Sequence, residues 1–137
     1  MSLPYTQEQL ELKDTLHRFL GEHCNTEFVR HRIKSNEITD KDLWHKLNEL
    51  GLVSSFATEE SGGVGLGFRE LGIVAYESGW FLLTEPLLSA AFFGSYFLTQ
   101  ILDKDSLSLI ESDLVLSVVE GKRRVIGCLE SSPVTVK

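Results

Sequence analysis

One segment of the chain, residues 86–102, is apolar on nearly every side of the helix that it would form. Such a helix is stable only when other elements surround it, because no face of it suits water. Its length is near the lower limit for crossing a bilayer, but polar residues interrupt it and the acidic residues Glu85 and Asp103 flank it. We therefore predict a buried helix that begins at Pro86, where proline is favoured, and no membrane span.

Two amphipathic helices are expected near the N-terminus. Thr6 suits an N-cap, and Gln9 three residues later completes a capping-box pattern, which predicts a helix over residues 6–23. A shorter helix is expected from residue 25 or 26 to about residue 33, with Ile33 facing the interior.

A third helix is expected after Thr39, its predicted N-cap, and it would end at Gly51, where glycine adopts a positive φ at little cost. The predicted buried face of this helix consists of Leu43, Trp44, Leu47 and Leu50. The glycine-rich stretch 62–67 lacks the spacing of a phosphate-binding loop. We interpret it as an irregular connection that needs close backbone approach and positive φ, and we expect a fourth helix over residues 68–78.

The composition changes after residue 105. Residues 106–113 suit a short helix, and two runs rich in β-branched residues, 114–119 and 125–129, flank a polar turn, which is typical of a β-hairpin. A lone hairpin is marginal in water, so we interpret residues 106–137 as the beginning of an incomplete β domain. The predicted fold is mainly α: an all-α domain over residues 1–105 with about five or six helices, and a short C-terminal β-hairpin.

The charge and the cysteines exclude several classes of protein. Thirteen basic residues against twenty acidic ones give a net charge of −7, which argues against nucleic-acid binding. Cys24 and Cys128 form no zinc or disulfide pattern, and no pair of the four histidines has the spacing of a helical metal site. The N-terminus shows no secretory signal, so a cytoplasmic location is expected.

No constellation of catalytic residues is evident. Glu59 and Glu60 are adjacent carboxylates, which point apart in a loop and are interpreted as solvated. The basic cluster at residues 30–34 is interpreted as a solvated face near a helix C-terminus, where positive charge is favoured. We therefore predict no catalytic residue and no metal ligand in this chain.

Several motifs in order nevertheless resemble the N-terminal domain of the acyl-CoA dehydrogenase family. The stretch 43–52 reads LWHKLNELGL and is similar to the family's "W..L.ELGL" helix end, and residues 59–67, EESGGVGLG, are similar to its "PEEyGG.GLG" loop. Residues 77–79, Glu-Ser-Gly, and residues 86–89, Pro-Leu-Leu-Ser, match the next two motifs in sequence.

This resemblance implies a flavoprotein with three domains, in which the all-α domain precedes a β-barrel and a C-terminal helical domain. In the intact enzyme a carboxylate base removes the substrate α-proton while FAD accepts the β-hydride, so an acyl-CoA thioester becomes α,β-unsaturated. The base and the FAD-binding residues lie in the later domains. The N-terminal helices would supply one wall of the acyl-chain cavity, and the candidate residues carried over to this chain are Ser89, Phe92, Phe93 and Tyr96.

The sequence departs from the family at the segment that touches the flavin. Aligned on Glu130, it has Ile126 in place of the family's aromatic residue and Leu129 in place of a threonine. Leucine has no hydroxyl group that could bond to the flavin edge. We therefore expect that this chain alone binds no FAD.

Three functional hypotheses follow. The first is an N-terminal portion or truncated subunit of an acyl-CoA dehydrogenase-like flavoprotein that is inactive alone, with acyl-CoA as a possible ligand. The second is a non-catalytic interaction module that forms a homodimer or binds a full-length dehydrogenase subunit through the exposed side of the 86–102 helix. The third is a binder of acyl chains or lipids without redox chemistry.

Overall fold

The computed structural model describes residues 4–35, 40–96, 116–119 and 124–127. The chain divides into two compact units, residues 1–39 with 67–84 and residues 40–66 with 85–137, and each is described by itself. The described part is mainly helical, as the sequence predicted. The predicted domain boundary at residue 105 lies outside the described residues and stays a prediction.

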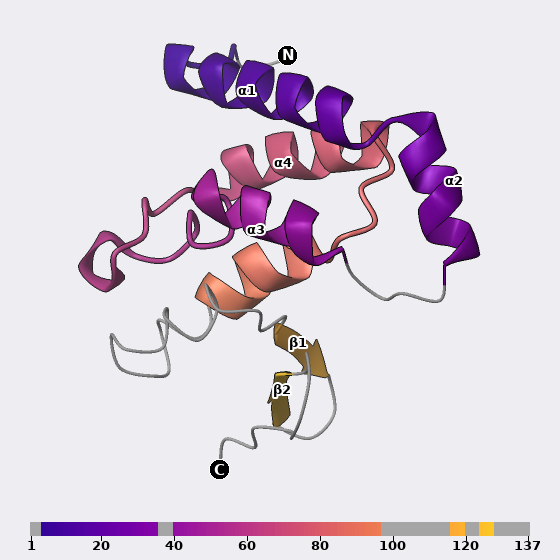
Figure 1. Ribbon diagram of the computed structural model, residues 1–137. Coiled ribbons are helices and arrows are strands. Elements are labelled where there is room, and N and C mark those ends of the chain that lie inside the picture. The colour runs from indigo at the N-terminus through magenta and orange to yellow at the C-terminus, as the bar shows by residue number, and fades with distance from the viewer. Residues whose placement is uncertain (1–3, 36–39, 97–115, 120–123, 128–137) are drawn as a thin grey trace. The chain divides into compact units, whose positions relative to one another are not determined.

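The first unit contains α1 (Gln7–His23), α2 (Thr26–Lys34) and α4 (Phe68–Trp80). Helices α1 and α4 lie side by side, and α2 follows α1 after a sharp bend (Figure 1). Four buried apolar residues form the core between α1 and α4: Leu16, Leu20, Ile73 and Val74.

The capping box predicted for the first helix is confirmed. Thr6 Oγ1 accepts a hydrogen bond from the backbone N–H of Gln9 at 3.2 Å, and the Thr6 N–H donates to Gln9 Oε1 at 3.1 Å. The buried Gln9 side chain also donates through Nε2 to Glu70 Oε1 at 2.6 Å. The second oxygen of Glu70, Oε2, accepts from the Gly67 N–H at 3.0 Å. Gln9 and Glu70 therefore connect the first turns of α1 and α4.

Helix α2 begins after its N-cap Asn25, whose side chain accepts from the Phe28 N–H at 2.8 Å. Two predictions about this helix are wrong. Ile33 is 76% exposed, because it shares with Val29 a face that lines an open groove rather than the core. The cluster at residues 30–34 is not wholly solvated, since Arg32 is buried.

The second unit contains α3 (Lys41–Glu49), a 3₁₀ turn η1 (Glu59–Ser61), a π-helix η2 (Leu88–Tyr96) and the strands β1 (Leu116–Val119) and β2 (Arg124–Gly127). The N-cap of α3 is Asp40 rather than Thr39, because the Asp40 carboxylate accepts from the Leu43 N–H at 2.9 Å. The Asp40 N–H donates in turn to the buried carboxylate of Glu85 at 3.1 Å.

The prediction for the buried face of α3 is correct for three residues and wrong for the fourth. Leu43, Trp44 and Leu47 are buried, but Leu50 is exposed because it is the C-cap residue, where the helix ends. Gly51 follows at φ +71°, which confirms the glycine signal that ends this helix.

The connection from α3 to α4 is irregular, as its glycines predicted. Gly62 and Gly65 have φ values of +90° and +70°. Gly63 lies so close to the backbone of Ala57 that a Cβ atom there would overlap the Ala57 carbonyl group. The Gly65 N–H donates to the same carbonyl oxygen at 2.8 Å, which holds the loop in place.

The elements near the C-terminus are described in part. The helix predicted from Pro86 is observed as η2, and residues 97–115, which include the rest of that helix and the predicted helix over 106–113, lie outside the described residues. Strands β1 and β2 pair antiparallel, with Leu116 opposite Gly127 and Val119 opposite Arg124. Residues 120–123 between them are not described, so the hairpin and the total number of helices stay predictions.

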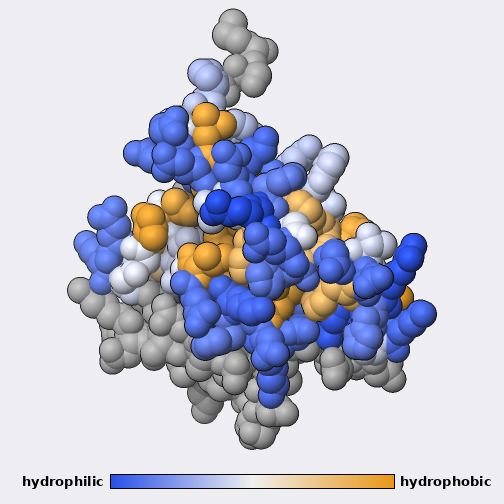
Figure 2. All heavy atoms as spheres, turned by 45° about the horizontal axis from the view of Figure 1, so that its top comes forward, coloured by the Kyte–Doolittle hydropathy of each residue, from blue (hydrophilic) through white to orange (hydrophobic). Residues whose placement is uncertain are grey.

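The surface in Figure 2 is mainly hydrophilic, with apolar side chains in separate patches between charged ones. In the part of the chain that the structure describes, no helix is both long and apolar enough to cross a bilayer.

Candidate functional site

Helix η2 carries the residues predicted to form an acyl-chain wall. It is anchored by buried Leu87 and Ala91, and Ser95 Oγ donates a hydrogen bond to the Ala91 carbonyl oxygen. Of the predicted wall residues, Ser89 is exposed and Phe92 is half-buried. Phe93 and Tyr96 belong to η2 by their backbone, but the structure does not describe their side chains.

Phe92 packs against an aromatic residue of the loop that follows α3. Its ring contacts the buried ring of Phe56 edge-on, with 5.7 Å between the centroids and 87° between the planes. An edge-to-face pair of this geometry contributes about 0.5–1.5 kcal/mol beyond the area that it buries. Phe92 therefore takes part in the core of its unit, while Ser89 faces outward.

The segment predicted to touch a flavin is described only in part. Ile126 lies in β2 opposite Ser117, and Leu129 and Glu130 lie outside the described residues. Ile126 and Leu129 have hydrocarbon side chains, which can neither donate nor accept the hydrogen bonds that fix a flavin ring. We assign the chain no step of flavin chemistry.

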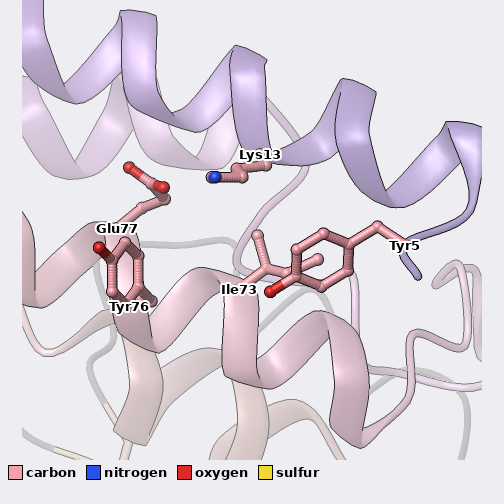
Figure 3. Close-up of a pocket in the computed structure, with 5 residues that line it drawn as sticks. All are labelled: Tyr5, Lys13, Ile73, Tyr76 and Glu77. Atoms are coloured by element: carbon pink, nitrogen blue, oxygen red, sulfur yellow. The ribbon is translucent and has the colours of Figure 1, made fainter. Parts of the chain in front are cut away.

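A small pocket of about 100 Å³ lies between α1 and α4 (Figure 3). Its lining combines one aliphatic side chain with two phenols, an ammonium group and a carboxylate: Ile73, Tyr5, Tyr76, Lys13 and Glu77. Figure 3 shows the ends of Lys13 and Glu77 directed toward the same space.

Glu77 is the most unusual residue of this pocket, since it is an acid that is only 1% exposed. Its Oε2 lies 2.8 Å from Nδ1 of His17, and because a carboxylate only accepts, the imidazole is the donor. Its other oxygen, Oε1, is buried and has no hydrogen-bond partner among the described residues. The His17 ring also contacts Phe81 edge-on, with centroids 4.9 Å apart.

The sequence did not predict that His17 and Glu77 pair, and it indicated Glu77 only as part of the Glu-Ser-Gly motif. The partners are 60 residues apart, so no local pattern connects them. One signal was available: Glu77 follows Ile73 and Val74 at the spacing that continues the buried face of α4. An acid on a buried face requires a partner, and a basic residue on a neighbouring helix is the natural candidate.

Glu70, at the start of α4, has a pKa that differs from the ordinary carboxyl value. The hydrogen bond from Gln9 is the main cause that lowers the pKa of Glu70, and the backbone N–H groups of Glu70 and Gly67 and the charge of Arg69 act in the same direction. Partial burial opposes them without reversing the shift. The carboxylate form is thus the one that the first turn of α4 favours.

The described residues also bear on the predictions about metal ligands and about the acidic pair of the glycine-rich loop. No cluster of three or more His, Cys, Asp or Glu side chains that could hold a metal ion occurs within the described ranges. Glu59 and Glu60 are both exposed, in agreement with the expectation of a solvated loop. The pocket between α1 and α4, by contrast, brings a carboxylate and an ammonium group together with two phenols.

Comparison with known proteins identifies the family. The pattern of the family described as "Acyl-CoA dehydrogenase, N-terminal domain" matches residues 6–96, and the chain belongs to this family. The match covers α1 to η2 and includes every motif on which the resemblance was based. No curated protein gives a significant match to the sequence.

A similar fold occurs in a solved structure, "Crystal structure of the ChsE4-ChsE5 complex from Mycobacterium tuberculosis". The TM-score is 0.74 and the sequence identity 23%, over 93% of this chain and 40% of that chain. At this identity the likeness concerns the fold. The chain spans about two fifths of the length of the chain that it resembles.

Proposed function

We propose that this chain supplies the helical N-terminal domain of an acyl-CoA dehydrogenase-like flavoprotein, which dehydrogenates acyl-CoA thioesters between the α and β carbons. The observation that carries the proposal is the family match over residues 6–96. Because fold and function are separate properties, the activity rests on the family rather than on a reactive group in this chain.

The role that we assign to the chain is to shape the acyl-chain cavity. The surface used would be η2, and Ser89, Phe92, Phe93 and Tyr96 are the candidate wall residues. Support comes from the outward position of Ser89 and from the fixed position of Phe92 against Phe56. A wall needs apolar side chains held in place, and Phe92 meets that requirement.

We further propose that flavin binding and the catalytic base are contributed by residues outside this chain, in a partner acyl-CoA dehydrogenase subunit. The hydrocarbon side chains of Ile126 and Leu129 support this division of roles. That solved structure is itself a complex of two proteins, ChsE4 and ChsE5. A homodimer of this chain is the alternative assembly.

The test is thioester oxidation with an artificial electron acceptor, measured for the chain alone and mixed with a flavin-containing acyl-CoA dehydrogenase subunit. We expect no turnover by the chain alone and an altered KM or chain-length preference of the mixture. A mixture that behaves as the subunit alone, with no co-elution in light scattering, would contradict the proposal. A homodimer of the chain that does not bind the subunit would support the alternative assembly.

A substitution in η2 and a matched control test whether η2 forms the wall of the acyl-chain cavity. Ser89→Trp adds bulk to the proposed cavity side of η2, so KM for long acyl chains should rise more than KM for short ones. Val64→Trp makes a similar change at an exposed position of the α3–α4 loop and should leave both values unchanged.

A further inference from the structure

A second hollow lies in the first unit, where the end of α1, the length of α2 and the end of α4 meet. Its volume is about 440 Å³, within the range of roughly 300–1,000 Å³ that is usual for small-molecule sites. We call it the α2 groove and define it by its lining residues: Gly21, Cys24, Asn25, Thr26, Val29, Arg30, Ile33, Trp80, Phe81 and Leu82.

The lining of the α2 groove is largely apolar and includes large side chains that folding leaves open to solvent. Ile33, Trp80 and Leu82 are 76%, 65% and 66% exposed. Trp80 is held by stacking against Tyr76, with ring centroids 6.2 Å apart. A concave group of exposed apolar residues is typical of a surface that binds something.

The backbone at one end of the groove supports this interpretation. Leu82 has a φ of +53° and is the one non-glycine residue with positive φ among the described residues. A leucine in this conformation costs roughly 1–2 kcal/mol, so the surrounding structure must enforce it. Hydrogen bonds from the Leu82 N–H to Gly79 and from the Leu83 N–H to Ser78 fix this turn. Such strain is common in segments that shape ligand sites.

The charge of the groove identifies the kind of ligand. Arg30 is the charged residue of its lining, whereas the chain as a whole has a net charge of −7. Beyond the lining, α2 carries Glu27 in its first turn and basic residues in its last turn. A guanidinium group binds a carboxylate through two parallel hydrogen bonds. One guanidinium at the wall of an apolar groove thus matches a ligand with one carboxylate and a hydrocarbon body.

We propose that the α2 groove binds a free fatty carboxylate of medium chain length. Its head group pairs with Arg30, and its chain lies against Val29, Ile33, Trp80 and Leu82. This site shares no residue with η2 or with the acyl-chain wall assigned there, so it does not depend on the proposed dehydrogenase role.

The binding experiment uses decanoate, below its micelle-forming concentration, and the fluorescence of the chain's two tryptophans. Trp80 is in the groove and exposed, whereas Trp44 is buried, so acrylamide quenching reports mainly on Trp80. We expect saturable protection of Trp80 by decanoate that does not vary with protein concentration. Uncharged decanol should bind about tenfold more weakly, because it lacks the charged hydrogen bonds. Trp80→Phe should remove the signal.

Two pairs of variants separate the head-group site from the apolar wall. Arg30→Gln should lower decanoate affinity to the level of decanol, while Arg18→Gln, on the exposed face of α1, should change neither ligand. Ile33→Ser should weaken both ligands, while Val64→Ser should weaken neither. All four positions are exposed, and circular dichroism confirms that each variant is folded.

Three results would overturn the proposal. The first is the absence of saturable protection by decanoate. The second is an equal effect of Arg30→Gln and Arg18→Gln on decanoate affinity. The third is protection of Trp80 that increases with protein concentration without decanoate, which would show that a second copy of this chain covers the groove.

Discussion

At the scale of single residues, the two acids of α4 form the polar contacts that join α4 to α1. Glu77 is buried and receives one hydrogen bond from His17, while Glu70 receives bonds from Gln9 and from the Gly67 N–H. Both acids thus depend on a side chain from α1. The free energy lost when the α1 partner is removed should differ between the two acids. A buried acid without its partner destabilises the folded protein far more than a half-buried one.

The pair of His17 and Glu77 is tested by removing the imidazole. His17→Ala should lower the free energy of unfolding by about 1–3 kcal/mol, nearer the lower value because the imidazole is partly solvated. The reason is that Glu77 stays buried without its donor. Urea denaturation followed by circular dichroism measures the effect. In a Glu77→Gln background the same substitution should cost clearly less, and an equal cost in both backgrounds would show that the two side chains are not coupled.

Glu70 should make stability depend on pH. Its pKa is lowered in the folded protein, chiefly by the hydrogen bond from Gln9, so its contribution is present above the ordinary carboxyl pKa and is lost as the pH falls through the folded value. Glu70→Gln should therefore be less stable than the parent at neutral pH, and the difference should shrink on acidification. The exposed Glu60→Gln serves as control. A difference that stays constant from neutral to acidic pH would contradict this role.

At this scale the sequence predicted local contacts and missed distant ones. The Thr6–Gln9 capping box was predictable because both residues lie within one turn and the pattern is specific. The bond from Gln9 to Glu70 spans 61 residues, and nothing in either local sequence indicates the other. The N-cap of α3 was misplaced by one residue, since Thr39 and Asp40 are both good caps and only the hydrogen bond to Leu43 decides between them.

At the scale of elements, the glycine-rich connection between α3 and α4 is determined by close backbone contacts. Gly63 packs against the backbone of Ala57, and Gly65 donates to the carbonyl oxygen of Ala57. The sequence predicted the irregular connection correctly, because clustered glycines are unfavourable in regular elements. It could not indicate which glycine makes the close contact.

This difference between glycines is measurable. Gly63→Ala should destabilise the protein strongly, because its Cβ would overlap backbone atoms that cannot move aside. Gly51→Ala has open space around it and should cost only the strain of a positive φ, about 1–2 kcal/mol. Thermal unfolding of the two variants compares them. If Gly51→Ala were the more harmful substitution, the assigned contact at Gly63 would be wrong.

The misplaced apolar residues have a common cause at this scale. Periodicity identifies a face of a helix, but it does not say whether another element covers that face. Ile33 shares a face with Val29, and that face of α2 lines an open groove. Leu50 continues the apolar spacing of α3, yet it lies where the helix has ended. The exposed Ile33 is one of the residues on which the proposed carboxylate site rests.

At the scale of the whole molecule, the family was recognisable because its motifs are short, follow one another in a fixed order along the chain, and lie at turns and helix ends. The glycine loop, the helix ends and the Pro-Leu-Leu-Ser start each specify local backbone geometry, so they persist in the sequence. The candidate acyl-chain wall was inferred from the same motifs. The structure adds that Ser89 is exposed and that the ring of Phe92 contacts Phe56.

The flavin content of the purified chain tests the central claim most directly. The chain is incubated with excess FAD, passed through a desalting column and examined by visible absorption. Since the side chains of Ile126 and Leu129 offer no hydrogen bonds to the cofactor, we predict that no flavin remains with the protein. Retention of about one flavin per chain, with bleaching on addition of an acyl-CoA, would contradict the claim that the flavin is bound by residues other than those of this chain.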